Sequence, residues 1–199
     1  MCIVVEGSDH LGKTTLCKKL LEHPLLKQRG YVYHALSRLP DGFHRFWGYK
    51  ALAQQRVVQD RFHMSEIAYA YARGDESTPL TPDRYRRVDA TLRLLPAFTV
   101  VLTISPSLLR HRLEHEPKEE MYDNALILRA NEVFRTIADT RIFVYNSAVY
   151  SDIDVDAQIH CDERSPYPTG LDALNIIDCY ERRLTQWESD AEVRQLSLF

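Results

Sequence analysis

Short, continuous apolar runs alternate with amphipathic stretches along this chain. The strongest run covers residues 98–104 (Phe-Thr-Val-Val-Leu-Thr-Ile), and a second one covers residues 3–6 near the N-terminus. Continuous apolar runs are typical of parallel strands that are covered on both faces. Strands are predicted at residues 3–6, 30–35, 56–59, 98–104 and 141–145. Their alternation with helical patterns predicts an α/β fold with a doubly wound, five-stranded parallel sheet.

Proline and polar loops indicate where the helices begin and how the chain is organised. Thr81-Pro82 and Ser105-Pro106 each place a capping hydroxyl before a proline at the first helical position. A proline-containing loop at residues 165–170 precedes a C-terminal helix that is predicted to end near Trp187. We expect one domain over residues 1–189, followed by a loosely held tail at residues 190–199.

Composition narrows the class of protein only a little. Of the 199 residues, 45% are hydrophobic and 27% are charged, and the net charge is −3. This charge gives no general argument for binding to nucleic acid or to membranes. We see no signal-peptide pattern and no apolar run long enough to cross a bilayer, so we expect a cytoplasmic protein. The four cysteines form no C-x-x-C pair, and Cys2 and Cys17 are predicted to be buried free thiols.

The most informative segment follows the first predicted strand. Gly7, Gly12, Lys13 and Thr14 have the spacing of a phosphate-binding loop, G-x-x-x-x-G-K-[ST]. Such a loop aims backbone N–H groups at phosphate oxygens and needs glycine where the chain bends most tightly. Lys13 is expected to reach the β- and γ-phosphates of ATP, and the Thr14 hydroxyl to bind Mg²⁺. The residues predicted to contact the nucleotide are Gly7, Ser8, His10, Leu11, Gly12, Lys13, Thr14 and Thr15.

An acid and an arginine, Asp60 and Arg61, follow the third predicted strand. Ligands of open α/β sheets lie at the C-terminal ends of the strands, which places Asp9, Arg38, Asp60 and Arg61 around one cleft. A carboxylate there is suited to holding Mg²⁺ through water, and an arginine is suited to bidentate capture of a phosphate. An isolated Asp-Arg pair would more often be a structural ion pair, but the neighbouring loop favours a functional one.

Three segments resemble the thymidylate kinases and, more broadly, the P-loop thymidylate and deoxynucleoside kinase family. Residues 6–15 (Glu-Gly-Ser-Asp-His-Leu-Gly-Lys-Thr-Thr) are similar to the family pattern E-G-x-D-G-x-G-K-T-T. Residues 38–42 are similar to R-E-P-G-G, and residues 60–69 to D-R-[YH]-x-x-S-x-x-A-Y. The resemblance covers about residues 2–145 and implies a nucleoside monophosphate kinase fold with a helical lid at about residues 108–124.

The resemblance implies roles for the matching residues. Asp9 would approach the sugar hydroxyl of the acceptor, and Asp60 would organise the metal. Arg61 would hold the phosphate of the acceptor, with Arg38 beside it. The acceptor pocket would be lined by Ser65 and Tyr69. An Asp-Arg pair, rather than Glu-Arg-Ser, favours a nucleoside monophosphate as the acceptor over a free nucleoside.

Two later segments carry weaker signals. In the lid segment, Arg112 is the candidate for neutralising the transferring phosphoryl group. The same segment contains His111-Arg112-Leu113-Glu114-His115, which matches the zinc-protease pattern H-x-x-E-H. No third ligand is identifiable, so we do not expect a catalytic zinc site. Residues 147–154, after the fifth predicted strand, are where the resemblance places the contact with adenine.

Two departures from the family concern the acceptor. Ala70 stands where thymidylate kinases have a glutamine that helps to hold the base, and only residues 43–58 separate the second motif from the third. Aromatic residues of this short segment, which could stack on a base or belong to the core, are Phe43, Phe46, Trp47 and Tyr49. We therefore expect the phosphate chemistry of the family to carry over, but not its thymine pocket.

The favoured function is Mg²⁺-dependent transfer of the ATP γ-phosphoryl group to a deoxynucleoside monophosphate, such as a dTMP-like acceptor. One alternative is a related kinase that phosphorylates a hydroxyl of a nucleoside or of a modified base in DNA. Another is a nucleotide-binding switch ATPase without a small acceptor. The expected partners are ATP and a nucleotide-type acceptor. The resembling family commonly forms homodimers.

Overall fold

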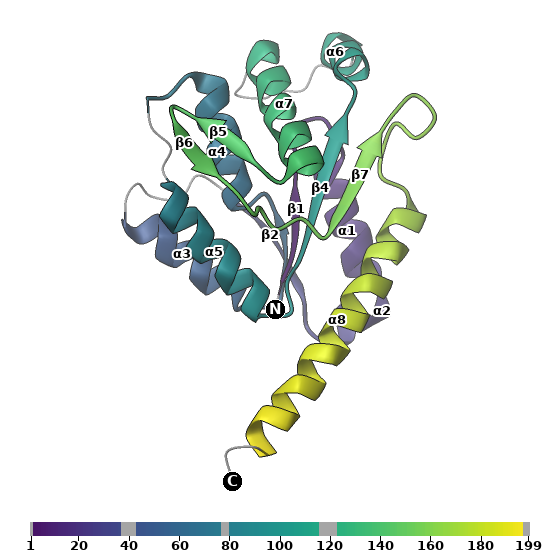
Figure 1. Cartoon of the computed structure of the whole chain (residues 1–199). Coiled ribbons are helices and arrows are strands. Elements are labelled where there is room, and N and C mark those ends of the chain that lie inside the picture. The colour runs from purple at the N-terminus through teal and green to yellow at the C-terminus, as the bar shows by residue number, and fades with distance from the viewer. Residues whose placement is uncertain (1, 37–42, 77–79, 116–122, 197–199) are drawn as a thin grey trace.

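The computed structural model describes residues 2–36, 43–76, 80–115 and 123–196 (Figure 1). Its central sheet has five strands in the order β2-β3-β1-β4-β7, and every pair of neighbours is parallel. The strands are β1 (Cys2–Glu6), β2 (Val32–Ala35), β3 (Val57–Asp60), β4 (Phe98–Ile104) and β7 (Ala157–Cys161). The predicted five-stranded parallel sheet is therefore confirmed.

The identity of the fifth strand differs from the prediction. The segment at residues 141–145 contains β5 (Phe143–Tyr145), which pairs antiparallel with β6 (Ala148–Tyr150) in a separate two-stranded sheet. Asn146 and Ser147 connect these strands with φ values of 46° and 65°. Positive φ at both central residues is the geometry of a tight hairpin turn, which folds β6 back beside β5. The fifth position is taken by β7, at the edge beside β4.

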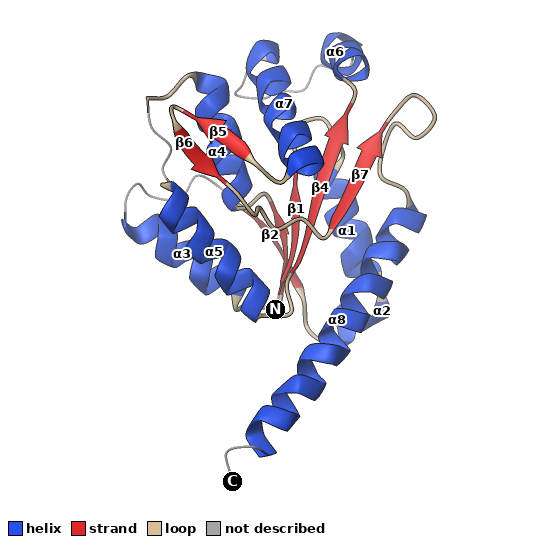
Figure 2. Ribbon diagram, viewed as in Figure 1, coloured by secondary structure: helices blue, strands red, loops and turns tan. Residues whose placement is uncertain are grey.

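Eight described helices surround the sheet. They are α1 (Lys13–Glu22), α2 (Pro24–Gln28), α3 (Phe43–Ala53), α4 (His63–Arg73), α5 (Pro82–Leu94), α6 (Pro106–His115), α7 (Asn124–Thr140) and α8 (Gly170–Leu196). Helices α1, α2 and α8 lie on one face, and α3, α4, α5 and α7 lie on the other (Figures 1 and 2). None of the described helices combines the length and the apolar character needed to cross a membrane.

The predicted helix starts are present, but the C-terminal helix is longer than predicted. The Thr81 hydroxyl accepts a hydrogen bond from the Arg84 N–H at 3.5 Å, and the Ser105 hydroxyl accepts one from the Leu108 N–H at 3.3 Å. Helix α8 continues past Trp187, where the sequence predicted its end, to Leu196.

Two hydrophobic cores, one on each face of the sheet, explain the continuous apolar runs. Along β1, Cys2 and Val4 pack into the core shared with α4, α5 and α7, whereas Ile3 and Val5 pack into the core shared with α1 and α8. Because both faces of the strand are buried, no polar position interrupts it before Glu6. The C-terminal end of β1 is thereby fixed at the centre of the sheet, where the glycine loop begins.

Candidate functional site

The glycine loop (residues 7–14) joins β1 to α1 and needs glycine at two positions. Gly7 has φ 144°, and a Cβ atom there would lie 2.8 Å from the carbonyl oxygen of Leu102. Gly12 has φ 78° and is the N-cap of α1. Between them His10 also adopts a positive φ, of 63°. Left-handed residues of this kind are typical of loops whose backbone N–H groups form anion-binding nests.

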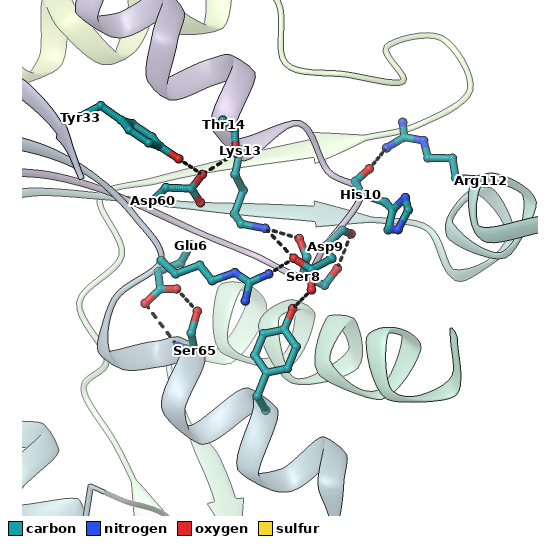
Figure 3. Close-up of polar contacts among 12 residues, drawn as sticks. Glu6, Ser8, Asp9, His10, Lys13, Thr14, Tyr33, Asp60, Ser65 and Arg112 are labelled. Carbon is teal, nitrogen blue, oxygen red and sulfur yellow. Dashed lines mark hydrogen bonds and ion pairs between the residues drawn. The ribbon is translucent and has the colours of Figure 1, made fainter. Parts of the chain in front are cut away.

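Lys13 begins α1 and extends into the loop (Figure 3). Its Nζ donates to the carbonyl oxygen of Ser8 at 2.6 Å and lies 3.7 Å from Oδ1 of Asp9. The first turn of α1 contains no acidic residue, so the positive end of the helix dipole is not neutralised there. A buried cation and a helix N-terminus therefore face the same space, which is an arrangement suited to phosphate.

Thr14 and Asp60 come together as a pair of oxygen ligands. The Thr14 hydroxyl donates to Oδ2 of Asp60 at 2.6 Å, and the Tyr33 hydroxyl donates to the same oxygen at 3.0 Å (Figure 3). A hydroxyl beside a carboxylate is a donor set that Mg²⁺ prefers, so these residues fit the metal expected from the sequence. Among the described residues, no group of three or more His, Cys, Asp or Glu side chains is arranged to hold a metal, and the histidines of the H-x-x-E-H segment form none.

Asp9 is the centre of a second cluster. One of its oxygens, Oδ1, forms an ion pair with Arg61, and Oδ2 accepts a hydrogen bond from the Tyr69 hydroxyl at 2.7 Å. The Arg61 guanidinium also lies 5.0 Å from the centre of the Tyr69 ring. The structure thus brings together three of the residues predicted to contact the acceptor. A carboxylate, a guanidinium and a phenol in one cluster can recognise a hydroxyl and a phosphate of the same molecule.

Ser65 is oriented by Glu6, a residue that the sequence did not single out. Oε1 of Glu6 accepts hydrogen bonds from the N–H groups of Met64 (2.9 Å) and Ser65 (3.3 Å), and Oε2 accepts one from the Ser65 hydroxyl at 2.5 Å. Burial raises the pKa of Glu6, and the hydrogen bonds from Ser65 oppose that shift. The Ser65 hydroxyl is engaged in fixing the start of α4. The feature of the sequence that could have pointed to Glu6 is a carboxylate at the end of a buried strand.

Arg112 lies at the opposite end of the glycine loop. It is only 2% exposed, donates to the carbonyl oxygen of His10 at 2.7 Å, and its guanidinium lies 4.0 Å from the ring centre of Tyr167. A Cβ on Gly12 would lie 3.3 Å from Tyr167 and Pro168, so the segment after β7 packs on the loop.

Residues 147–154, which the sequence placed after the last strand of the main sheet, contain the β5–β6 hairpin turn, β6 and the segment that follows it. The expectation that they follow the last strand of the main sheet is therefore wrong.

Some predicted residues lie outside the described part. These are Arg38, residues 116–122 of the lid segment, and the side chains of Phe43 and Phe46. Trp47 on α3 is 49% exposed, whereas Tyr49 is buried and donates from its hydroxyl to Glu66 at 2.7 Å. Tyr49 thus belongs to the core. Within the described residues, α3 is the one helix between β2 and β3.

Comparison with known proteins gives a distant sequence relative and a structure of the same fold. No family model matches the chain. Over 160 residues it is 25% identical to a probable thymidylate kinase of Archaeoglobus fulgidus, and the match covers 65% of this chain and 77% of that protein. The crystal structure of YorR from Bacillus subtilis, in complex with phosphorylated GDP, has the same fold with a TM-score of 0.67. It is 22% identical, and the match covers 91% of this chain and 96% of YorR.

Proposed function

We propose that this protein is a kinase that transfers the γ-phosphoryl group of ATP to a deoxynucleoside monophosphate. The observation that carries the proposal is the position of two cations around one carboxylate. Lys13 and Arg61 both face Oδ1 of Asp9, one from the glycine loop and the other from the end of β3. Two cations that converge on one site from different elements suit two phosphate groups that must approach each other. The sequence similarity to a probable thymidylate kinase supports the same function.

The transfer needs positioning more than covalent chemistry. An oxygen of the acceptor phosphate attacks the γ-phosphorus, the bond from that phosphorus to the β–γ bridging oxygen breaks, and ADP leaves with the bonding electron pair. The attacking oxygen is already ionised, so no general base is required. Lys13 holds the phosphates of ATP, and Arg61 holds the acceptor phosphate. Thr14 and Asp60 would hold Mg²⁺, which when bound neutralises charge on the β- and γ-phosphates.

The remaining residues of the site shape its two sides. Asp9, oriented by the Tyr69 hydroxyl, is placed to accept a hydrogen bond from the sugar of the acceptor. On the opposite side of the site from Asp9, Arg112 donates to the carbonyl of His10, and so supports the part of the glycine loop that would hold ATP. Its guanidinium, stacked on Tyr167, also brings positive charge to that part.

One observation favours a second candidate. A single described helix, α3, lies between β2 and β3, so the acceptor side is built from few elements. Such a site could admit an acceptor that is too large to enclose, such as a modified base in DNA. Its acceptor would be a hydroxyl, whose proton must be removed, and the carboxylate of Asp9 could accept it.

The test is ADP release with Mg²⁺·ATP against nucleosides, nucleoside monophosphates and duplex DNA with and without modified pyrimidines. We expect turnover with one or a few deoxynucleoside monophosphates. Lys13→Ala should lower that turnover by about 100-fold or more, since a charge-stabilising group is lost, and should leave the circular dichroism spectrum unchanged. Phosphate transfer to DNA alone would support the second candidate. Tight binding of ATP with no acceptor in the panel would contradict both and favour a switch ATPase.

A further inference from the structure

We propose that Tyr33 is a positioning residue that holds the Asp60 carboxylate in the orientation needed to bind the metal. The proposal rests on the proposed function, because it assigns Asp60 to Mg²⁺. Tyr33 lies on β2, at the edge of the sheet, and belongs to none of the motifs in the sequence. Its hydroxyl donates to Oδ2 of Asp60 at 3.0 Å.

The register of the sheet explains why Tyr33 reaches this carboxylate. On the neighbouring strand, Tyr33 is paired with Val58, and Asp60 lies two residues further on. Side chains two residues apart point to the same face of a strand, so Tyr33 and Asp60 share the face that α1 covers. A diagonal neighbour at that spacing is within reach of an aromatic side chain but beyond a short one. The length of tyrosine is therefore what allows the hydrogen bond.

The two hydrogen bonds to Asp60 come from different elements and act on one oxygen. Thr14, on α1, and Tyr33, on β2, both donate to Oδ2. Within the described part of the chain, no hydrogen bond reaches Oδ1, which leaves that oxygen for a metal or a metal-bound water. A carboxylate held by one donor can still rotate, whereas two donors from separate directions define its plane. Groups of this kind typically change metal affinity by about 10- to 100-fold when they are removed.

Tyr33→Phe isolates this hydrogen bond. Tyr33 is 39% exposed, so we expect the phenylalanine ring to keep the same place and the substitution to remove one oxygen without opening a cavity. Tyr31→Phe is the matched control. Tyr31 lies just before the same strand, but its hydroxyl is hydrogen-bonded to Tyr180 of α8, so the same atom is lost away from Asp60.

The experiment measures the binding of ADP by calorimetry, with Mg²⁺ and with EDTA, and needs no turnover. The ratio of the two affinities reports the metal site alone. We expect Tyr33→Phe to reduce this ratio by about tenfold while the affinity in EDTA stays unchanged. The Mg²⁺ concentration that gives half-maximal kinase activity should rise by a similar factor. Tyr31→Phe should keep the wild-type ratio and instead lower the melting temperature.

Two results would overturn the inference in distinguishable ways. If Mg²⁺ strengthens ADP binding equally in the wild type and in Tyr33→Phe, Tyr33 does not position the metal ligand, and the proposed function is unaffected. If Mg²⁺ does not strengthen ADP binding in the wild type, the assignment of Thr14 and Asp60 to Mg²⁺ fails, and with it the reason for the role of Tyr33.

Discussion

Arg61 shows how the conformation of a single residue determines where a charge is placed. Its φ of 68° lies in the left-handed region, which costs a non-glycine residue about 1–2 kcal/mol. The bend is stabilised by a hydrogen bond of 2.9 Å from its N–H to the carbonyl oxygen of Val5, and by the ion pair with Asp9. Because the chain turns at this residue, the guanidinium points toward the glycine loop instead of continuing along the sheet.

Arg61→Ala should separate use of the acceptor from binding of the donor. Under the proposed function, Arg61 and the acceptor phosphate form a charged pair that is largely removed from water. Removing one partner of such a pair costs about 2–5 kcal/mol, so we expect kcat/KM for the acceptor to fall by about 100-fold or more. The dissociation constant of Mg²⁺·ADP should change by less than about threefold, because Lys13 and Thr14 remain. Arg73→Ala, which removes the arginine that ends α4 and is paired with Asp75 just beyond the helix, is the control for loss of charge. Equal losses in acceptor use and in ADP binding would make Arg61 structural.

At the residue scale, the sequence predicts those arrangements that depend on local spacing. Lys13 and Thr14 follow Gly12 directly, and Arg61 follows Asp60, so the motif itself fixes how they are arranged. Tyr33 could not be predicted, because its contact depends on the register between two strands that 21 residues separate, from Ala35 to Val57. Long-range register is set by tertiary packing, which no local pattern contains.

At the scale of elements, α4 connects the glycine loop to the acceptor cluster. Its first N–H groups are bound by Glu6, and it carries Tyr69, which orients Asp9. A second buried contact ties the helix to α5. Nε2 of His63 lies 2.6 Å from Oδ1 of Asp89, and these residues are 0% and 2% exposed. The position of α4, and so of the acceptor cluster, depends on these buried polar contacts.

A double-mutant cycle on His63 and Asp89 should reveal strong coupling. His63→Phe or Asp89→Leu alone leaves a buried polar partner without its hydrogen bond, at a cost of about 3 kcal/mol in the free energy of unfolding. The double variant should cost at least about 1 kcal/mol less than the sum of the single variants, because both polar groups are gone. Urea unfolding measures each value.

The exposed pair Asp83 and Arg86 on α5, with side chains that are 78% and 57% exposed, is the control cycle. Its coupling should stay below about 0.5 kcal/mol. If the costs at His63 and Asp89 were additive, their coupling would be as small as that of the exposed pair. The buried contact would then not hold the two helices together.

The strands illustrate which elements can be predicted. β1 and β4 are central and buried on both faces, so their sequences are continuously apolar and were found. β7 has the sequence Ala-Gln-Ile-His-Cys and is an edge strand with alternating exposure, so it gives a weak signal. Phe143–Tyr145 is as apolar as a central strand, yet a two-residue turn folds it into a hairpin. The strands of the main sheet could be predicted where burial on both faces determines the sequence. They could not be predicted where the pairing between strands determines which sheet a segment joins.

At the scale of the whole molecule, each of the two hydrophobic cores contains at least one cysteine, so the reactivity of the thiols can test how both cores are packed. Cys2 lies in the core under α4 and α7, while Cys17 and Cys161 lie in the core under α1 and α8. Burial raises the pKa of Cys2 to about 12 and that of Cys161 to about 11, and it raises the pKa of Cys17 further. Cys179 on α8 is only partly buried. The thiols therefore differ in reactivity according to the fold around them.

Alkylation with iodoacetamide at about pH 8, followed by peptide mass spectrometry, tests this arrangement. The thiolate is the reactive form, and at this pH a thiol with a pKa of about 11 is ionised to about one part in a thousand. We expect Cys179 to react first in the folded protein, and all four cysteines to react in urea. Cys161 decides the topology, because it is buried only if residues 157–161 form the strand beside β4 and beneath α8. If Cys161 reacted as fast as Cys179 in a protein whose Cys2 and Cys17 stayed protected, one edge of the sheet would be open and the assignment of β7 would be wrong.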